Sequence, residues 1–196
     1  MKMQSRSKGT ALVTGASSGI GAIYADRLAH RGHDLILVAR NQQRLDALAE
    51  RLRSDTGNCI EAVVADLNNG KDLGHVEQLL RTNQQITMLV NNAGVAAVTP
   101  FLETDLDEIE EMIMLNVRAL TRLALAAAPR FVARGSGTIV NIASVLGTAP
   151  ELLNGVYGGT KAFVIALSLS LHKELVDKNV RVQVVLPGAT ATDLWE

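Results

Sequence analysis

Short apolar runs alternate with longer segments of helical periodicity along most of this chain. The short runs are rich in β-branched residues and apolar nearly throughout, which is typical of strands buried on both faces of a sheet. We expect strands at Thr10–Thr14, Asp34–Val38, Ile60–Ala65, Thr87–Asn91, Thr138–Ile142 and Val180–Leu186. The helix candidates between them lie near Gly19–His30, Asn41–Ser54, Lys71–Asn83, Asp105–Ala133 and Tyr157–Asp177.

This alternation of strand and helix predicts an α/β fold, with a doubly wound parallel sheet between two layers of helices. No internal repeat, low-complexity tract or linker divides the sequence. We therefore expect residues 1–196 to form a single three-layer α/β/α domain.

The longer helix candidates carry a second signal. In the candidate at 105–133, residues at helical spacing form a stripe that is apolar except for one amide: Ile109, Met112, Ile113, Asn116 and Leu120. A buried amide must be hydrogen-bonded. Asn116 therefore either bonds the helix to a neighbouring loop or acts at a functional site.

The helix candidate at 157–177 is itself apolar on every side over part of its length. The stretch 162–167 is apolar on all sides, and 123–128 is rich in alanine. One side of each helix can pack on the sheet, but the other side also needs cover. We therefore expect a homo-oligomer, a dimer or tetramer, formed through helices 105–133 and 157–177.

Composition narrows the class of protein. Hydrophobic residues make up 47% of the 196 residues, which excludes a disordered chain. The net charge of −1 gives no sign of a basic surface for nucleic acid. The lone cysteine, Cys59, excludes an internal disulfide and fits a reducing compartment.

The sequence also indicates where the protein resides. It begins with basic residues but has no apolar signal region, and no apolar run reaches membrane-spanning length. We expect a cytoplasmic protein with no membrane partner. Its histidines pair with no Cys, His or carboxylate at ligand spacing, so no metal site is predicted: His30, His33, His75 and His172.

A glycine-rich turn, Thr-Gly-Ala-Ser-Ser-Gly-Ile-Gly at 14–21, directly follows the first strand. Gly15 permits a sharp turn, Gly19 lets the backbone approach a pyrophosphate, and Gly21 allows close helix packing. The helix that follows offers free N–H groups and a positive dipole end to an anion. We expect Ser17, Ser18 and Ile20 to contact the same ligand, although the motif alone could be a plain turn.

Polar residues follow the second and third strands. Enzymes that use NAD usually have an acidic residue near position 40, where this chain has Arg40. An Arg can bind a 2′-phosphate with its planar fork, so NADP(H) is favoured and NAD(H) stays possible. Asp66, followed by Leu67, could accept from an adenine amino group; a surface Arg and a turn-forming Asp are the alternatives.

The last two strand ends carry further candidates. Asn92, Ala93 and Gly94 follow the fourth strand, where small residues let a flat ring lie against the backbone, or simply make a turn. Tyr157 and Lys161 lie one helical turn apart, and Ser144 ends a strand-like run just upstream of them. A phenol, an ammonium and a hydroxyl are the groups needed to pass a proton to or from a carbonyl oxygen.

These motifs together resemble the short-chain dehydrogenase/reductase family, in its main single-domain branch. The resemblance covers almost the whole chain in order and approximate spacing, through 14–21, Asp66, 91–94, Asn116, Ser144, Tyr157, Lys161 and Pro187-Gly188. It implies a Rossmann-type NAD(P)-binding domain. It also implies an oxidoreductase that transfers a hydride between the nicotinamide and a carbonyl or alcohol substrate.

The resemblance assigns roles to individual residues. Tyr157 would be the general acid in reduction and the base in oxidation, and Lys161 would lower its pKa and hold the nicotinamide ribose. Ser144 would bind the substrate oxygen, and Asn116 would position a water in a proton relay. These intact residues argue against the alternative, a catalytically silent dinucleotide-binding regulator or scaffold.

Further residues follow from the same resemblance. Pro187 and Gly188 would cover the nicotinamide, Thr192 matches the residue that binds its carboxamide, and Thr190 is a weaker candidate. Val145 and Leu146 would line the substrate pocket.

The sequence stops at Glu196, where family members usually continue with a substrate-covering loop and a seventh strand. We expect the sequence to be incomplete, because 180–185 would otherwise be an exposed apolar edge. The absent part carries most substrate selectivity. A 3-oxoacyl thioester, a sugar, a steroid-like ketone and a small aldehyde therefore all stay open.

Overall fold

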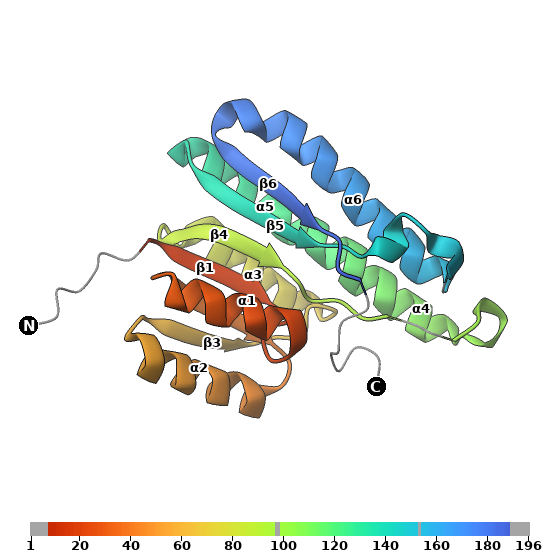
Figure 1. The fold of residues 1–196 in the computed structure, drawn as a ribbon, viewed down its shortest axis with the longest axis horizontal. Helices are drawn as coiled ribbons and strands as arrows, with labels where there is room; N and C mark the ends of the chain where they lie inside the picture. The colour runs from red at the N-terminus through yellow and green to blue at the C-terminus, as the bar shows by residue number, and fades with distance from the viewer. Residues whose placement is uncertain (1–7, 97–98, 153, 189–196) are drawn as a thin grey trace, which may run out of the picture.

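The strands form one parallel sheet at the centre of the protein (Figure 1). The structure, a computed structural model, describes residues 8–96, 99–152 and 154–188. Six parallel strands have the order β3-β2-β1-β4-β5-β6. They are β1 (Thr10–Thr14), β2 (Asp34–Ala39), β3 (Ile60–Val64), β4 (Ile86–Asn91), β5 (Gly137–Ile142) and β6 (Val180–Val185). Each agrees with its predicted range to within one residue.

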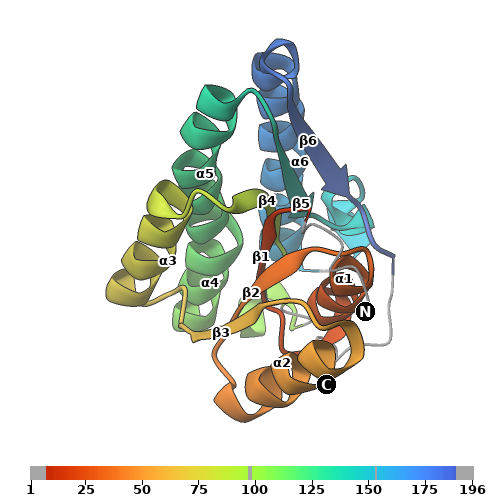
Figure 2. The same cartoon turned by 90° about the vertical axis from the view of Figure 1, so that its left-hand side faces the viewer.

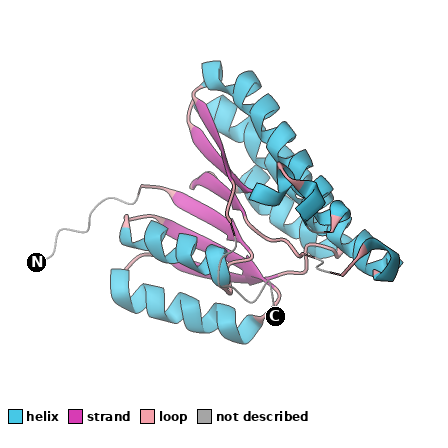
Figure 3. Cartoon of the chain, turned by 45° about the vertical axis from the view of Figure 1, so that its right-hand side comes forward, coloured by secondary structure: helices cyan, strands magenta, loops and turns pink. Residues whose placement is uncertain are grey.

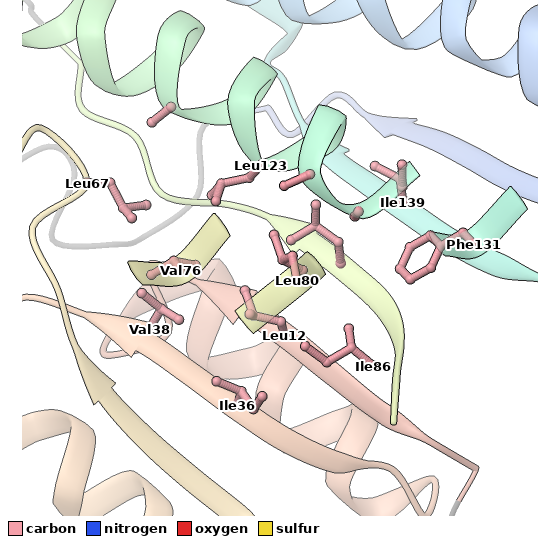
Figure 4. Close-up of a cluster of buried hydrophobic side chains, with 14 of the residues drawn as sticks. Leu12, Ile36, Val38, Leu67, Val76, Leu80, Ile86, Leu123, Phe131 and Ile139 are labelled. Atoms are coloured by element: carbon pink, nitrogen blue, oxygen red, sulfur yellow. The ribbon is translucent and has the colours of Figure 1, made fainter. Parts of the chain in front are cut away.

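Helices cover both faces of this sheet, which confirms the three-layer, Rossmann-type fold (Figures 2 and 3). The first two helices, α1 (Gly19–His30) and α2 (Gln42–Thr56), lie on one face. The other face carries α3 (Gly70–Thr82), the long helix that includes α5 (Leu120–Arg134), and α6 (Gly155–Leu175). Leu123 and Phe131 of α5 pack with Leu80 of α3 over the central strands (Figure 4).

The predicted helix at 105–133 is one continuous rod with a π-helical turn inside it. It consists of α4 (Leu106–Ile113), the π segment η2 (Met114–Ala119) and α5. Met112, Asn116 and Leu120 are buried as predicted, but Ile113 is 42% exposed, so its place on the stripe was wrong. The helix buries the face that carries Met112, Asn116 and Leu120, and Ile113 lies to one side of that face.

This rod is long and apolar enough to cross a membrane by length and composition alone. Half of its most apolar window is buried inside the protein, against the sheet and α3. Among the described residues it is the one helix that meets this test, and its packing makes it a core helix. Leu125 of α5 and Phe163 and Leu169 of α6 stay exposed, and the oligomer predicted from these helices stays a prediction.

The sixth strand lies at the edge of the sheet, as expected, but it is not apolar throughout. Val180 and Val182 are buried under α6, whereas Arg181 and Gln183 are exposed on the opposite face. Buried and exposed residues alternate along β6 because, among the described residues, a helix packs on one face of this strand.

A threonine side chain joins the two halves of the sheet where the strand order reverses, between β1 and β4. Thr14 Oγ1 accepts from the backbone N–H groups of Asn92 and Ala93, both at 3.0 Å. Asn92 Nδ2 donates in return to the carbonyl oxygens of Thr14 and Gly15, at 3.0 and 3.2 Å. The glycine-rich turn and the loop after β4 are therefore held side by side at the carboxyl end of the sheet.

We expect Thr14→Val to lower the free energy of unfolding by about 2–4 kcal/mol, because it leaves two partly buried N–H groups without their acceptor. Chemical denaturation at neutral pH measures the loss. Thr14→Ser is the matched control, since it keeps the oxygen and removes one methyl group, at a cost of about 1 kcal/mol. Equal stability of the Val and Ser variants would contradict this account of the junction.

Candidate active site

A cavity of about 400 Å³ opens at the carboxyl ends of the strands. Most of the residues predicted to bind cofactor or substrate line it. They are Gly15, Ser17, Ser18, Gly19, Ile20, Arg40, Asp66, Leu67, Asn92, Ala93, Gly94, Ser144, Tyr157, Lys161, Pro187 and Gly188. Gly21, Asn116, Val145 and Leu146 do not line it, and Thr190 and Thr192 lie outside the described residues.

The glycine-rich turn has the backbone geometry that its sequence predicts. Gly15 and Gly19 have φ angles of +63° and +51°, which favour glycine. A Cβ on Gly21 would lie 2.1 Å from the carbonyl oxygen of Gly15. The helix can therefore pack this closely against the turn because residue 21 has no side chain. Ser18 is the N-cap of α1, but its side chain makes no cap hydrogen bond, and the first turn contains no acidic residue. This helix end can therefore accept an anion.

Two arginines line the same end of the cavity. Arg40 is exposed at the end of β2, and Arg44 lies in the first turn of α2. Asn41 caps this helix and accepts from the Arg44 N–H at 3.0 Å. Sequence reasoning missed Asn41 and Arg44, although Arg44 lies one helical turn after Arg40 and the Asn-x-x-Arg start of α2 was a usable signal.

Asp66 lines the cavity and shapes its own turn at the same time. Its Oδ1 accepts from the Asn68 N–H at 3.0 Å, and its own N–H donates to Asp72 Oδ2 at 2.9 Å. The turn alternative is thus present in the structure, while the predicted contact to adenine stays a prediction. Leu67 lies mostly in the hydrophobic core beneath.

Tyr157 and Lys161 are both buried in the wall of the cavity. Their side chains are 3% and 6% exposed, and Lys161 Nζ lies 5.7 Å from the centre of the Tyr157 ring. Lys161 Nζ also donates to the carbonyl oxygen of Ile142 at 3.2 Å. Ser144, buried at the end of β5, accepts from the Leu146 N–H at 3.2 Å. The structure therefore brings the predicted phenol, ammonium and hydroxyl to one wall of the cavity.

Burial dominates the ionisation of this pair. It raises the pKa of Tyr157 above its usual value, and a side-chain hydrogen bond with Ser144 opposes the rise. Burial also lowers the pKa of Lys161 to about 8. The predicted lowering of the Tyr157 pKa was therefore wrong for the protein without cofactor. The cause is the dry environment, which disfavours the charged form of both groups.

Asn116 lies behind this wall and makes a loop contact. Its Oδ1 accepts from the Val95 N–H at 3.0 Å, and its Nδ2 donates to the Val95 carbonyl at 2.8 Å and to Thr160 Oγ1 at 3.1 Å. Thr160, which sequence reasoning missed, donates to the Tyr157 carbonyl at 2.8 Å. The packing role is thus present, and the relay role stays a prediction.

The two predicted substrate residues after Ser144 lie outside the cavity. They begin a 3₁₀ turn, η3 (Val145–Gly147), which leaves Val145 largely exposed. Leu146 is half-buried and packs near Tyr157 instead. Val95 and Leu115 line the cavity in addition to the predicted residues.

The comparison with known proteins identifies the family. A family model described as short chain dehydrogenase matches residues 9–196. A curated relative, an uncharacterized oxidoreductase of Staphylococcus epidermidis, is 34% identical over 186 residues, which are 95% of this chain and 80% of the relative. This chain therefore belongs to the short-chain dehydrogenase family, as its motifs suggest, and is an oxidoreductase of that family.

Two solved structures are similar over nearly the whole chain. One is a short-chain dehydrogenase from Sphingobium yanoikuyae in complex with NADPH, which is 55% identical, with a TM-score of 0.94. The other is a bulky-bulky ketone specific alcohol dehydrogenase from Comamonas testosteroni, which is 51% identical, with a TM-score of 0.93. The matches cover 95% of this chain and 73% and 75% of those chains.

The buried Lys161 predicts a distinctive dependence of stability on pH. Its pKa of about 8 in the folded protein is below the usual 10.5, so the unfolded chain binds more protons between these values. The free energy of unfolding should therefore rise with pH in this window, relative to Lys161→Met, by about 2–3 kcal/mol between pH 8 and 10. Denaturant unfolding without cofactor measures the difference.

The matched control is Lys173→Met, which removes an exposed lysine of the same helix. Its stability should run parallel to that of the parent protein over the same pH range. Parallel curves for Lys161→Met as well would show that Lys161 keeps an ordinary pKa.

Proposed function

We propose that this chain is an NADP(H)-dependent oxidoreductase that transfers a hydride between the nicotinamide and a ketone or alcohol. The observation that carries the proposal is one cavity with an anion-binding helix end, two arginines and a proton-donating wall. The similarity to a dehydrogenase solved with NADPH supports the same choice of cofactor.

The residues of the cavity fit such a dinucleotide. Gly15 and Gly19 would bring the N-terminus of α1 against the pyrophosphate, where its free N–H groups can bind. Arg40, with Arg44 beside it, would hold the 2′-phosphate that distinguishes NADP(H) from NAD(H). Asp66 would face the adenine, and Lys161 would hold the nicotinamide ribose.

NADPH, when bound, supplies the hydride, and the protein supplies the proton and the orientation. Tyr157 Oη would donate its proton to the carbonyl oxygen as that oxygen gains charge. Ser144 Oγ would hydrogen-bond the same oxygen and stabilise the alkoxide. The ammonium of Lys161 would stabilise the phenolate that forms.

We infer reduction as the physiological direction, because NADPH usually serves as a reductant. A phenol that stays protonated throughout the neutral range is ready to act as a general acid. With a pKa of about 8, Lys161 is also mostly protonated at pH 7. The rival function, a silent dinucleotide-binding regulator, does not need this buried pair.

The proposal also covers the class of substrate, the cellular location and the oligomeric state. A ketone with two large substituents is the first substrate class to test, because a 51% identical neighbour is specific for bulky-bulky ketones. We further propose a cytoplasmic homo-oligomer that covers the exposed apolar residues Leu125, Phe163 and Leu169, and binds neither nucleic acid nor membranes.

We expect the protein to bind NADPH more tightly than NADH, and Arg40→Asp to weaken NADPH binding about 100-fold, because it replaces a charge-assisted hydrogen bond with repulsion. NADH binding should change little. Fluorescence titration of the reduced cofactors measures both affinities. Lys71→Asp, the same change of charge at an exposed position outside the cavity, is the control. Equal affinities of the parent protein for NADPH and NADH would exclude a 2′-phosphate site at Arg40.

We expect Tyr157→Phe to reduce kcat for ketone reduction about 10³-fold, because the general acid is lost. NADPH affinity should change less than about threefold, since the phenyl ring still fills the wall. Steady-state absorbance of NADPH with a ketone panel measures turnover, and Tyr24→Phe, on α1, is the control. Normal turnover in the Tyr157→Phe variant would remove Tyr157 from the mechanism.

A further inference from the structure

The residue that caps the helix of Tyr157 makes bonds that a cap does not require. Asn154 is the N-cap of α6, three residues before Tyr157, and it is 5% exposed. Its Oδ1 accepts from the N–H groups of Val156 and Tyr157, at 3.0 and 3.4 Å. Its Nδ2 donates to the carbonyl oxygen of Thr99 at 2.7 Å and to Thr104 Oγ1 at 3.2 Å.

The cap itself needs an acceptor oxygen and no donor. Serine, threonine and aspartate cap helices as well as asparagine does. At this position they would leave the Thr99 carbonyl without its amide donor. The choice of an amide is therefore explained by the two bonds of Nδ2, which tie α6 to the loop after β4.

The loop after β4 also lies next to the cavity and to Tyr157. Residues 92–94 at its start line the cavity, and Val95 and Ala96 pack against the cluster that Met112 and Tyr157 form. Asn116 holds the loop at Val95, and Asn154 holds it again at Thr99 and Thr104. One side chain thus fastens the start of the helix that carries Tyr157 to Thr99 and Thr104.

We propose that Asn154 is a positioning residue, which fastens Thr99 and Thr104 to the start of α6 and so keeps the Tyr157 phenol dry and correctly aimed. This inference rests on the proposed function. Tyr157 and Met112 form an apolar cluster, against which Val95, Ala96, Leu146 and Val156 pack. Ser144 is the polar group that hydrogen-bonds the Tyr157 side chain. Lys161 is the charged group beside it. Loosening the loop would admit water to the phenol without removing any group that touches substrate or cofactor.

The discriminating variant is Asn154→Asp, which keeps the capping oxygen and removes both amide donors. We expect kcat for a ketone that the parent protein reduces to fall about tenfold, with NADPH affinity unchanged within about twofold. Water that reaches the phenol should lower the pKa of Tyr157 toward its ordinary value, but the new carboxylate of Asn154→Asp opposes this fall, so the pKa is measured in the uncharged variant Thr104→Val. A tyrosinate absorbance titration measures this pKa, as the difference between each protein and its Tyr157→Phe counterpart.

The matched control is Asn69→Asp at the N-cap of α3, where the Asn69 side chain accepts from the N–H groups of Lys71 and Asp72 and α3 carries no residue of the cavity. It should change neither kcat nor the Tyr157 pKa. If Asn154→Asp behaves in the same way, Asn154 is only a cap and the inference is wrong.

A second variant covers the case in which Asn154→Asp does not fold. Thr104→Val leaves the cap intact, adds no charge and removes one partner of Nδ2, so it should lower kcat by a smaller amount and lower the Tyr157 pKa. An unchanged pKa in Thr104→Val would then overturn the inference. Because the titration needs no turnover, it also tests the clamp if the parent protein reduces no ketone, which would count against the proposed function alone.

Discussion

The hydrogen bonds between Thr14 and the start of the loop after β4 are the constraint on which the cavity depends. The sheet reverses its strand order between β1 and β4, and α/β proteins bind ligands at such a point because loops diverge there. The hydrogen bonds of Thr14 and Asn92 keep the loops after β1 and β4 in contact at this point. They hold the glycine-rich turn on one side and the small residues of 92–94 on the other at a fixed separation.

From this junction, further hydrogen bonds connect the loop after β4 to the surroundings of Tyr157. Asn116 fixes Val95, Thr160 links Asn116 to the backbone of Tyr157, and Asn154 fastens the far end of the loop to α6. Each amide is buried or nearly so and uses its polar atoms within this set. The position of Tyr157 is therefore set by neighbours that are themselves anchored to the sheet, which gives a proton donor a defined direction.

The same burial explains the electrostatics of the wall. Burial raises the pKa of Tyr157, which keeps its phenol neutral, and lowers the pKa of Lys161. In the protein without cofactor, Tyr157 therefore keeps its proton. The cation is needed once the phenol has given up its proton. Lys161 Nζ lies 5.7 Å from the centre of the Tyr157 ring, so in the proposed reduction the ammonium would be close enough to stabilise the phenolate.

Much of this could be predicted from sequence, because the signals are local. Apolar runs define the strands, and Gly15 and Gly21 are required by a backbone that approaches itself closely. The failures involve tertiary surroundings. Ile113 is exposed although its spacing places it on the apolar stripe, and the direction of the Tyr157 pKa shift depends on burial that no spacing reveals. Asn154 looks like an ordinary cap until the loop that it holds is seen.

The most direct test of the central claim is the transfer of deuterium from NADPH labelled at the nicotinamide C4 to a ketone with two large substituents. Mass spectrometry of the product alcohol shows whether the label has moved. The account predicts one deuterium at the carbinol carbon from one of the two C4-labelled forms, and about 10³-fold slower formation of the labelled alcohol when Tyr157 is replaced by Phe. Tight binding of NADPH without label transfer to any ketone or aldehyde offered would contradict it, and would favour a regulator that binds the dinucleotide without using it.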